Sequence, residues 1–370
     1  MASRTLLEHG REARRRPGAA RPLANPAPAP RRRSVLAGPI VAGFLVIVGL
    51  FATDAAGVPL RDPDHVAALY LVLVGFGVVL LVGLDIAVRA ARSEGTRRPS
   101  RAAMAAVRRE RWTSARAVAA GTALISFYVS YMAYRNLKAI VPLLRPDDVF
   151  DRQLADLDRS MFLGHDPADL LHSALGVGVP THILSTGYAA FIVFLPLSLA
   201  VALVFSRDIR AGLFYATALS VNWVLGAASY FLLPSLGPIY YEPKSFAHLP
   251  HSEVTRLQDM LLDQRVEFLV HPTTATPQAI AAFASLHISM SLTAALAAHL
   301  LGLGRRLKIG LWLWLALTTL ATVYFGWHYF LDDLAGIVIA VGALGAARLL
   351  TGIDLRAARL TPRSAQPAAD

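Results

Sequence analysis

The chain has 370 residues, of which 55% are hydrophobic and only 16% are charged. Soluble domains carry about 25% charged residues, and apolar runs near the roughly 20 residues that cross a bilayer recur here, so the composition indicates a multi-span helical membrane protein. The formal net charge is +11, and there is no cysteine. The lack of cysteine excludes disulfides, a thiolate nucleophile and cysteine-ligated metals.

The N-terminal segment, residues 1–33, is rich in Arg, Ala and Pro and predicts a disordered cytoplasmic tail. The apolar run that follows could belong to a cleaved signal peptide, but it is long for one and the basic leader is very long. We therefore favour a retained first span. Binding of nucleic acid by this tail is disfavoured, because it has few aromatic residues for base stacking and membrane orientation accounts for its charge.

Eight apolar stretches predict an all-α, polytopic membrane helical bundle. They are Val35–Thr53, Val66–Val88, Ala117–Met132, Ile183–Phe205, Ala211–Leu233, Ala281–Leu301, Ile309–Phe325 and Phe330–Leu350. The third could extend toward Leu144. Residues 34–116 then hold two extra spans and a basic linker, residues 117–350 a six-helix catalytic domain, and residues 351–370 a second cytoplasmic tail.

The basic residues predict the orientation of these spans. With eight spans, the two tails and the segments Arg89–Arg116, Ser206–Arg210 and Gly304–Lys308 all lie on one side. Loops rich in Lys and Arg stay in the cytoplasm, so both termini are predicted there and the remaining loops outside. The abundance of Ala, Arg and Gly suits a high-GC bacterium, which predicts a bacterial plasma membrane.

The first of three polar clusters on the predicted outer side is "KAIVPLLRP", Lys138–Pro146. Lys138 and Arg145 are two helical turns apart and can share a face. An ammonium and a guanidinium together suit a phosphate group. Alternatively, these side chains anchor the end of a span to lipid headgroups.

The second cluster is "FASLHISMS", Phe283–Ser291, in which Ser285 and His287 open an apolar helix. Backbone N–H groups at a helix N-terminus favour an anion. The alternative is that Ser285 only caps the helix and His287 is an interfacial histidine.

The third cluster is "TVYFGWHYFLDDLAG", Thr322–Gly336. His328 and Asp332 are at positions i and i+4 of one helical face, where a carboxylate can hold an imidazole in one tautomer. This indicates a nucleophile or a base, although an interfacial ion pair would give the same pattern. The three clusters together predict phosphoryl chemistry.

These segments resemble the type 2 phosphatidic acid phosphatase superfamily. Its first motif, Lys-X6-Arg-Pro, is matched by "KAIVPLLRP", and its second, Pro-Ser-Gly-His, is matched at Ser285 and His287. Its third, Ser-Arg-X5-His-X3-Asp, is matched only in its second half, because Ala321 and Thr322 stand where Ser and Arg would be.

Within that superfamily, the chain looks more like the inositol phosphorylceramide synthase (inositolphosphotransferase) branch. The segments that carry this resemblance are "YFGWHYFLDDLAG", "LDRSMFLGHDP" at Leu157–Pro167 and "LLPSLGPIYYE" at Leu232–Glu242. The resemblance covers roughly residues 117–350.

The resemblance implies a phosphohistidine mechanism without a metal or another cofactor. His328 would attack phosphorus, Asp332 would orient it, and His287 would protonate the leaving oxygen and then activate the acceptor. The phosphoryl oxygens would be held by Lys138, Arg145 and Ser285. The neighbouring Asp333 receives no catalytic role.

The acceptor decides between two enzymes. We favour transfer of a phospho-headgroup from a lipid-linked donor to an inositol-like or other polyol alcohol, and Tyr240 and Tyr241 could contact such an acceptor. The alternative for these tyrosines is a belt at headgroup depth. With water as the acceptor, the chain would be a phosphatase of lipid phosphate or polyprenyl diphosphate. A non-catalytic lipid-binding protein or transporter is a further alternative, but it would place charges nearer mid-membrane.

Overall fold

The computed structural model describes residues 31–146 and 148–359, and within these ranges it contains helices and no strands. Seven helical stretches are long and apolar enough to cross a membrane. They are α1 (Arg32–Ala55), α2 (Val66–Glu94), α4 (Ser114–Leu144), α7 with α8 (Val179–Ala189 and Phe191–Phe205), α9 (Ile209–Leu232), α13 (Arg305–Tyr324) and α14 (Phe330–Thr351). The all-α polytopic bundle is therefore confirmed. The predicted tails lie largely outside the described residues.

The sixth predicted span is shorter than expected. We predicted Ala281–Leu301, but the helix, α12, covers only Leu286–Leu300. The preceding residues are not helical because their N–H groups bond elsewhere: those of Ala282 and Phe283 donate to the Ser235 carbonyl and hydroxyl oxygens, each at 3.0 Å. A local sequence pattern does not reveal such long-range partners.

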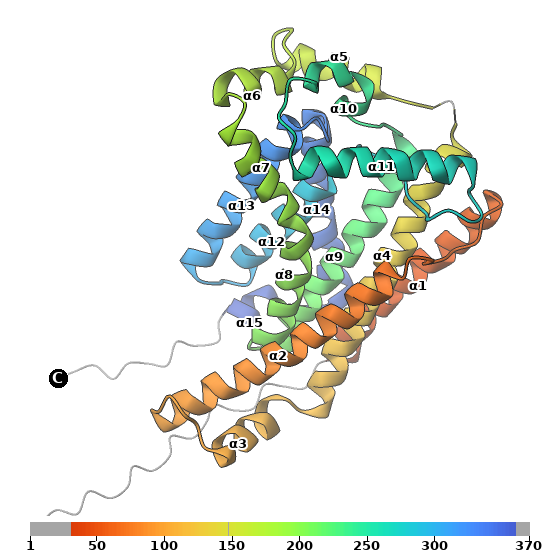
Figure 1. Cartoon of the computed structure of the whole chain (residues 1–370). Coiled ribbons are helices and arrows are strands. Elements are labelled where there is room, and N and C mark those ends of the chain that lie inside the picture. Colours follow the sequence, from red (N-terminus) through yellow and green to blue (C-terminus); the bar gives the residue numbers. More distant parts are fainter. Residues whose placement is uncertain (1–30, 147, 360–370) are drawn as a thin grey trace, which may run out of the picture.

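The bundle is organised around α9, the most deeply buried of the long helices. Helices α4 and α14 pack on it, and α12 and α13 complete the same side (Figure 1). The first helix, α1, packs against α4, α9 and α14 and so belongs to the bundle itself, whereas α2 lies at its edge with many apolar side chains exposed and only Ala67, Asp85 and Ala90 buried. An exposed apolar surface of this kind is what a lipid-facing helix presents.

Shorter helices cover one end of the bundle (Figure 1). They are α5 (Asp151–Met161), α6 (Pro167–Leu175), α10 (Pro238–Tyr241), the 3-10 turn η1 (Pro243–Phe246) and α11 (Glu253–Val270). The longest of them, α11, lies across the mouth of the bundle. All come from loops that the sequence predicts to be extracytoplasmic.

The opposite end carries the basic linker, part of which folds as α3 (Arg101–Arg111), and the short α15 (Leu355–Arg359). Asp85 of α2 accepts hydrogen bonds from Arg89 at 2.8 Å and from Arg111 at 2.6 Å. Arg116 donates to the Ser206 carbonyl at 2.7 Å. The carboxylate of Asp85 is therefore paired, and it joins α2 to α3.

Candidate active site

The turn between α13 and α14 is shaped by a glycine and a capping carboxylate. Gly326 ends α13 in the left-handed conformation, with φ of 64°, which glycine adopts without strain. The Trp327 N–H then donates back to the Thr322 carbonyl at 3.0 Å. On the other side, Asp332 accepts the Tyr329 N–H at 3.0 Å and so caps α14. These bonds fix the position of His328 between two helices.

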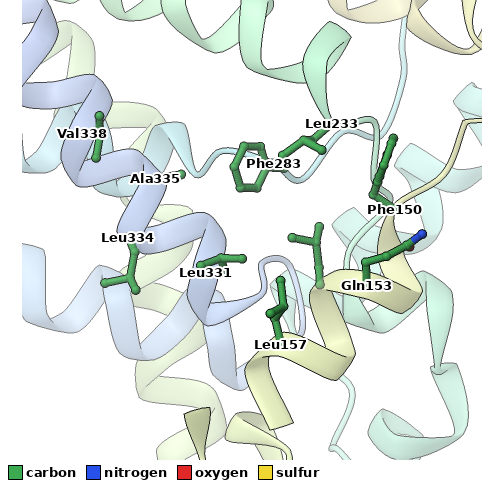
Figure 2. A pocket seen from close by; sticks show the side chains of 10 residues that line it. Phe150, Gln153, Leu157, Leu233, Phe283, Leu331, Leu334, Ala335 and Val338 are labelled. Atoms are coloured by element: carbon green, nitrogen blue, oxygen red, sulfur yellow. The ribbon is translucent and has the colours of Figure 1, made fainter. Parts of the chain in front are cut away.

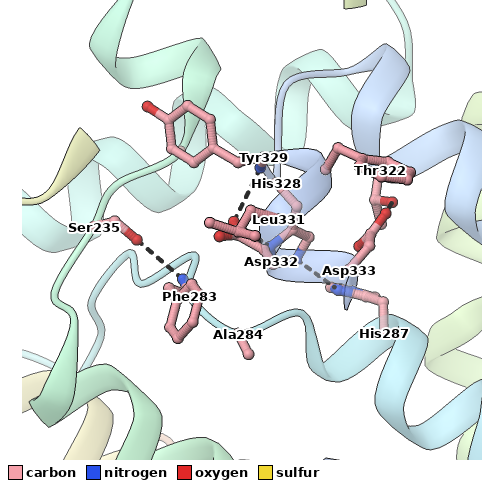
Figure 3. A network of polar contacts seen from close by, with 12 residues as sticks. Ser235, Phe283, Ala284, His287, Thr322, His328, Tyr329, Leu331, Asp332 and Asp333 are labelled. Atoms are coloured by element: carbon pink, nitrogen blue, oxygen red, sulfur yellow. Dashed lines mark hydrogen bonds and ion pairs between the residues drawn. The ribbon is translucent and has the colours of Figure 1, made fainter. Parts of the chain in front are cut away.

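The two ring nitrogens of His328 face different partners (Figure 3). Nδ1 lies 3.4 Å from Asp332 Oδ2, and Nε2 lies 3.3 Å from Nδ1 of His287. The side chain of His328 is only 6% exposed. Burial lowers the pKa of His328 to about 3, against the opposing effect of the Ala282 carbonyl. The imidazole is therefore neutral near pH 7, and with Nδ1–H directed at Asp332, Nε2 carries the lone pair and accepts the hydrogen bond from Nδ1 of His287.

His287 and His328 line a cavity of about 270 Å³ that reaches into the bundle. Lys138 of α4 lines the same cavity, with its Nζ 5.9 Å from the centre of the Tyr230 ring. Arg135 also lines it, but its guanidinium pairs with Asp64 at 2.6 Å. Two histidines and an ammonium group thus converge from three separate segments.

Ser285 stands at the N-cap of α12, fully buried beside the start of α14. Its N–H donates to the Asp332 carbonyl at 3.0 Å. Asp333, which follows Asp332 in α14, accepts a hydrogen bond from Thr322 at 3.2 Å and is also buried. We expected no catalytic role for Asp333, and its bond to Thr322 ties α13 to α14 directly behind the site.

Arg145 is not brought into this cavity. The helix α4 ends at Leu144, so the two-turn spacing between Lys138 and Arg145 does not put them on one face. Arg145 instead pairs with Asp148 at 2.7 Å and donates to the Phe231 carbonyl. Its role in holding phosphate remains a prediction that this arrangement does not favour.

Tyr240 and Tyr241 do not line the cavity either. The Tyr240 hydroxyl donates to the Gln258 carbonyl at 3.1 Å, and Tyr241 is exposed. Their segment instead packs against the turn that carries His328: the Ile239 N–H donates to the Gly326 carbonyl at 2.9 Å. A Cβ atom at Gly237 would lie 2.5 Å from the Trp327 carbonyl oxygen, so this close approach requires glycine.

Two carboxylates that the sequence did not single out hold the turn from α5. Asp158 accepts the Phe330 N–H at 2.6 Å and the Leu331 N–H at 3.0 Å. Asp151 accepts the Tyr329 hydroxyl at 3.0 Å and the Gly237 N–H at 2.8 Å. They lie seven residues apart, on one face of α5, and that spacing was the only signal for them in the sequence. Burial raises the pKa of Asp158 to about 6, although the backbone N–H groups oppose this shift.

A second hollow lies between α5 and α14, and it has a different character (Figure 2). Its volume is about 370 Å³. Its walls are almost entirely apolar, with Gln153 the one polar residue among Phe150, Leu154, Leu157, Leu233, Phe283, Leu331, Leu334, Ala335 and Val338. It contains no group that could act on phosphorus.

Within the described ranges, no group of three or more His, Cys, Asp or Glu side chains is placed to hold a metal ion. The expectation that no cofactor takes part remains a prediction.

Comparison with known proteins gives one match. A family model described as the PAP2 superfamily matches residues 152–346, just over half of the chain. The matched region contains His287, His328 and Asp332, whereas Lys138 lies before it. A search of curated proteins and a search of solved structures found no match.

Proposed function

Since the chain belongs to the PAP2 superfamily of lipid phosphatases and phosphotransferases, we propose that it transfers a phosphorus-bearing headgroup from a lipid to an alcohol through His328. The observation that carries this proposal is the contact of 3.3 Å between His328 and His287, in a cavity that also contains Lys138. This arrangement supplies a nucleophile, an acid and a cation around one point.

The geometry supports a reaction in two steps. In the first, Nε2 of His328 forms a bond to phosphorus while the bond from phosphorus to the leaving oxygen breaks, and His287 gives that oxygen a proton. Asp332 accepts the Nδ1–H bond and stabilises the charge that develops on the ring. In the second step, His287 takes the proton of the acceptor hydroxyl, whose oxygen displaces His328. The enzyme thereby returns to its starting state.

The cavity suits a lipid because its lining combines polar and apolar side chains. The apolar ones include Trp223, Leu286 and Met290. At its edge is Ile192 of α8, whose side chain is 52% exposed on the apolar surface. A headgroup at His328 would leave its hydrocarbon chain in this apolar part.

The burial of His328 supports an alcohol as acceptor. A nucleophile this enclosed is shielded from bulk water, which would otherwise hydrolyse a phosphohistidine. The hydroxyl groups of Tyr134 and Tyr230, 3.1 Å apart at the cavity wall, could hydrogen-bond a polyol. Inositol is one such acceptor, and water would make the chain a lipid phosphate phosphatase. We place the reaction on the extracytoplasmic side of a bacterial plasma membrane, because the cavity lies at the end opposite the basic linker.

The test uses purified protein in lipid nanodiscs with phosphatidic acid, a polyprenyl diphosphate or phosphatidylinositol, each with and without added inositol. Free phosphate and new lipids are measured by mass spectrometry. We expect H328A and H287A to lose turnover by about 1,000-fold or more, while H271A, in an exposed loop, keeps it. Full activity in H328A would overturn the mechanism. Free phosphate without a new lipid would make the chain a phosphatase instead.

A further inference from the structure

The helix α11 has one face turned toward the bundle. Its most buried residues are Val254, Gln258 and Phe268, and Leu257 and Leu261 line the catalytic cavity. At 100° per residue, Arg265 falls in the middle of this face, between Leu261 and Phe268. A charged residue in such a position needs a partner or a function.

The partner is not found within the described part of the chain. No carboxylate there lies within ion-pair distance of Arg265, and its guanidinium donates no hydrogen bond to any described residue. The other arginines near the site are engaged: Arg135 pairs with Asp64, and Arg145 pairs with Asp148. Arg265 is thus the free guanidinium at the mouth of the bundle among the described residues.

Arg265 has two charged neighbours near the site, Lys138 and Asp151. It is near enough to Lys138 for the two cations to repel each other, and it is attracted to Asp151, which bonds Tyr329 beside His328. Burial lowers the pKa of Arg265, so an anion bound between Arg265 and Lys138 would relieve both the repulsion and the desolvation. Lys138 lines the cavity, and Arg265 stands one helical turn after Leu261, which lines it too. Two neighbouring cations without ion-pair partners in the described chain suit a phosphate group.

Hydrogen bonds to other segments hold α11 in place, so the fold itself sets the position of Arg265. The Gln258 side chain donates to the Phe325 carbonyl at 2.8 Å, next to the turn that carries His328. The Val254 N–H donates to the Ser185 hydroxyl at 3.2 Å. After the helix, Arg61 from the loop between α1 and α2 donates to the Pro272 carbonyl at 3.0 Å. The two N-terminal spans therefore help to hold α11 over the site.

We propose that Arg265 binds the phosphoryl oxygens of the substrate headgroup together with Lys138, and so takes the place of the arginine that is absent at Thr322. This inference rests on the proposed function of the cavity. A guanidinium donates two parallel hydrogen bonds to phosphate oxygens, and a second cation favours headgroups with more than one negative charge, such as a phosphomonoester or a diphosphate.

The experiment compares R265Q with R256Q. Both remove one positive charge from α11, but Arg256 is 69% exposed and pairs only with Glu253 in the described chain, so R256Q is the matched control. We measure kcat and KM for the best lipid substrate, and the Kd of inorganic phosphate from the thermal shift it causes. R265Q should lower kcat/KM by about 100-fold and abolish the shift, and R256Q should leave both unchanged.

Equal behaviour of R265Q and R256Q, in a wild type that turns over lipid phosphate, would overturn the inference and leave the proposed function standing. If the wild type turns over no lipid phosphate but its phosphate-dependent shift is lost only in R265Q, the anion site stands and the proposed function fails. If R265Q does not fold, R265K is tested in its place, because a lysine cannot donate two parallel hydrogen bonds to phosphate. A higher Kd for inorganic phosphate supports the inference, and an unchanged Kd overturns it.

Discussion

At the scale of single residues, Asp158 shows how the catalytic turn is held. Its carboxylate accepts the N–H groups of two consecutive residues, Phe330 and Leu331, at the first turn of α14. These N–H groups have no partner within their own helix, and a negative charge near a helix N-terminus is favourable. The group that fixes the backbone after His328 therefore comes from a different helix.

We expect D158N to lower kcat by roughly 10- to 100-fold with little change in KM, because a carboxamide offers one acceptor oxygen to two N–H groups and the turn shifts. Steady-state kinetics measure this. D156N is the control, since Asp156 lies on the same helix with its side chain 63% exposed. A KM that rises while kcat is unchanged would show that Asp158 does not position the nucleophile.

The same pair of variants gives a pH dependence. Because burial raises the pKa of Asp158 to about 6 from 3.8, the folded state favours its protonated form. Its contribution to stability is therefore full below about pH 4 and is lost as the pH rises through about 6. The Tm of the wild type relative to D158N should fall across this window and then level off, and the Tm of D156N relative to D158N should fall in the same way, because D156N keeps Asp158.

At the scale of elements, the close approach of α12 and α14 brings the two histidines together. Gly336 permits it: a Cβ atom there would lie 2.5 Å from the Ser285 carbonyl oxygen and 3.3 Å from the Ile288 Cβ. Because Ser285 begins α12 and His287 follows it, the spacing between these helices sets the distance between His287 and His328. A backbone oxygen has little room to move away.

We therefore expect G336A to lower the Tm by several degrees and turnover by about 10-fold or more, since the start of α12 must shift away from α14. G345A is the matched control in the same helix, because a Cβ atom there meets nothing within 4 Å. Alanine at that position should leave the Tm unchanged or raise it slightly. Indistinguishable Tm and turnover values for the two variants would contradict this account of the helix contact.

At the scale of the whole molecule, the two ends of the bundle differ in their chemistry. The site, with α5 and α11 above it, occupies one end, and the Arg-rich linker with α3 occupies the other (Figure 1). Loops rich in Lys and Arg stay in the cytoplasm. The whole structure therefore leads us to expect an outward-facing site, which no single residue specifies.

The natural chain has no cysteine, so single cysteines report this orientation without background. We expect E267C, on the exposed face of α11, to react with an impermeant maleimide in intact cells. T96C, exposed in the linker before α3, should react only after the cells are permeabilised. The reverse labelling pattern would place the site on the cytoplasmic side.

The sequence by itself determined the helical bundle, because the hydropathy that drives membrane insertion is a property of each segment. It also indicated that His328 and Asp332 lie close together, although His328 stands in the turn before α14 and not on a face of that helix. The sequence pattern predicted the wrong start for α12. The N–H groups of Ala282 and Phe283 donate to Ser235 and not to a helix.

The packing of the bundle determines which distant groups share the cavity. It brought His287 to His328, which is 41 residues away, left Arg145 outside because α4 ends one residue earlier, and placed Asp158 against the turn that carries His328. Burial and the choice of partner depend on helices that are far apart in the chain, and no local pattern carries that information. The chemistry of each side chain was readable in the sequence, but its neighbours were set by the packing of the bundle.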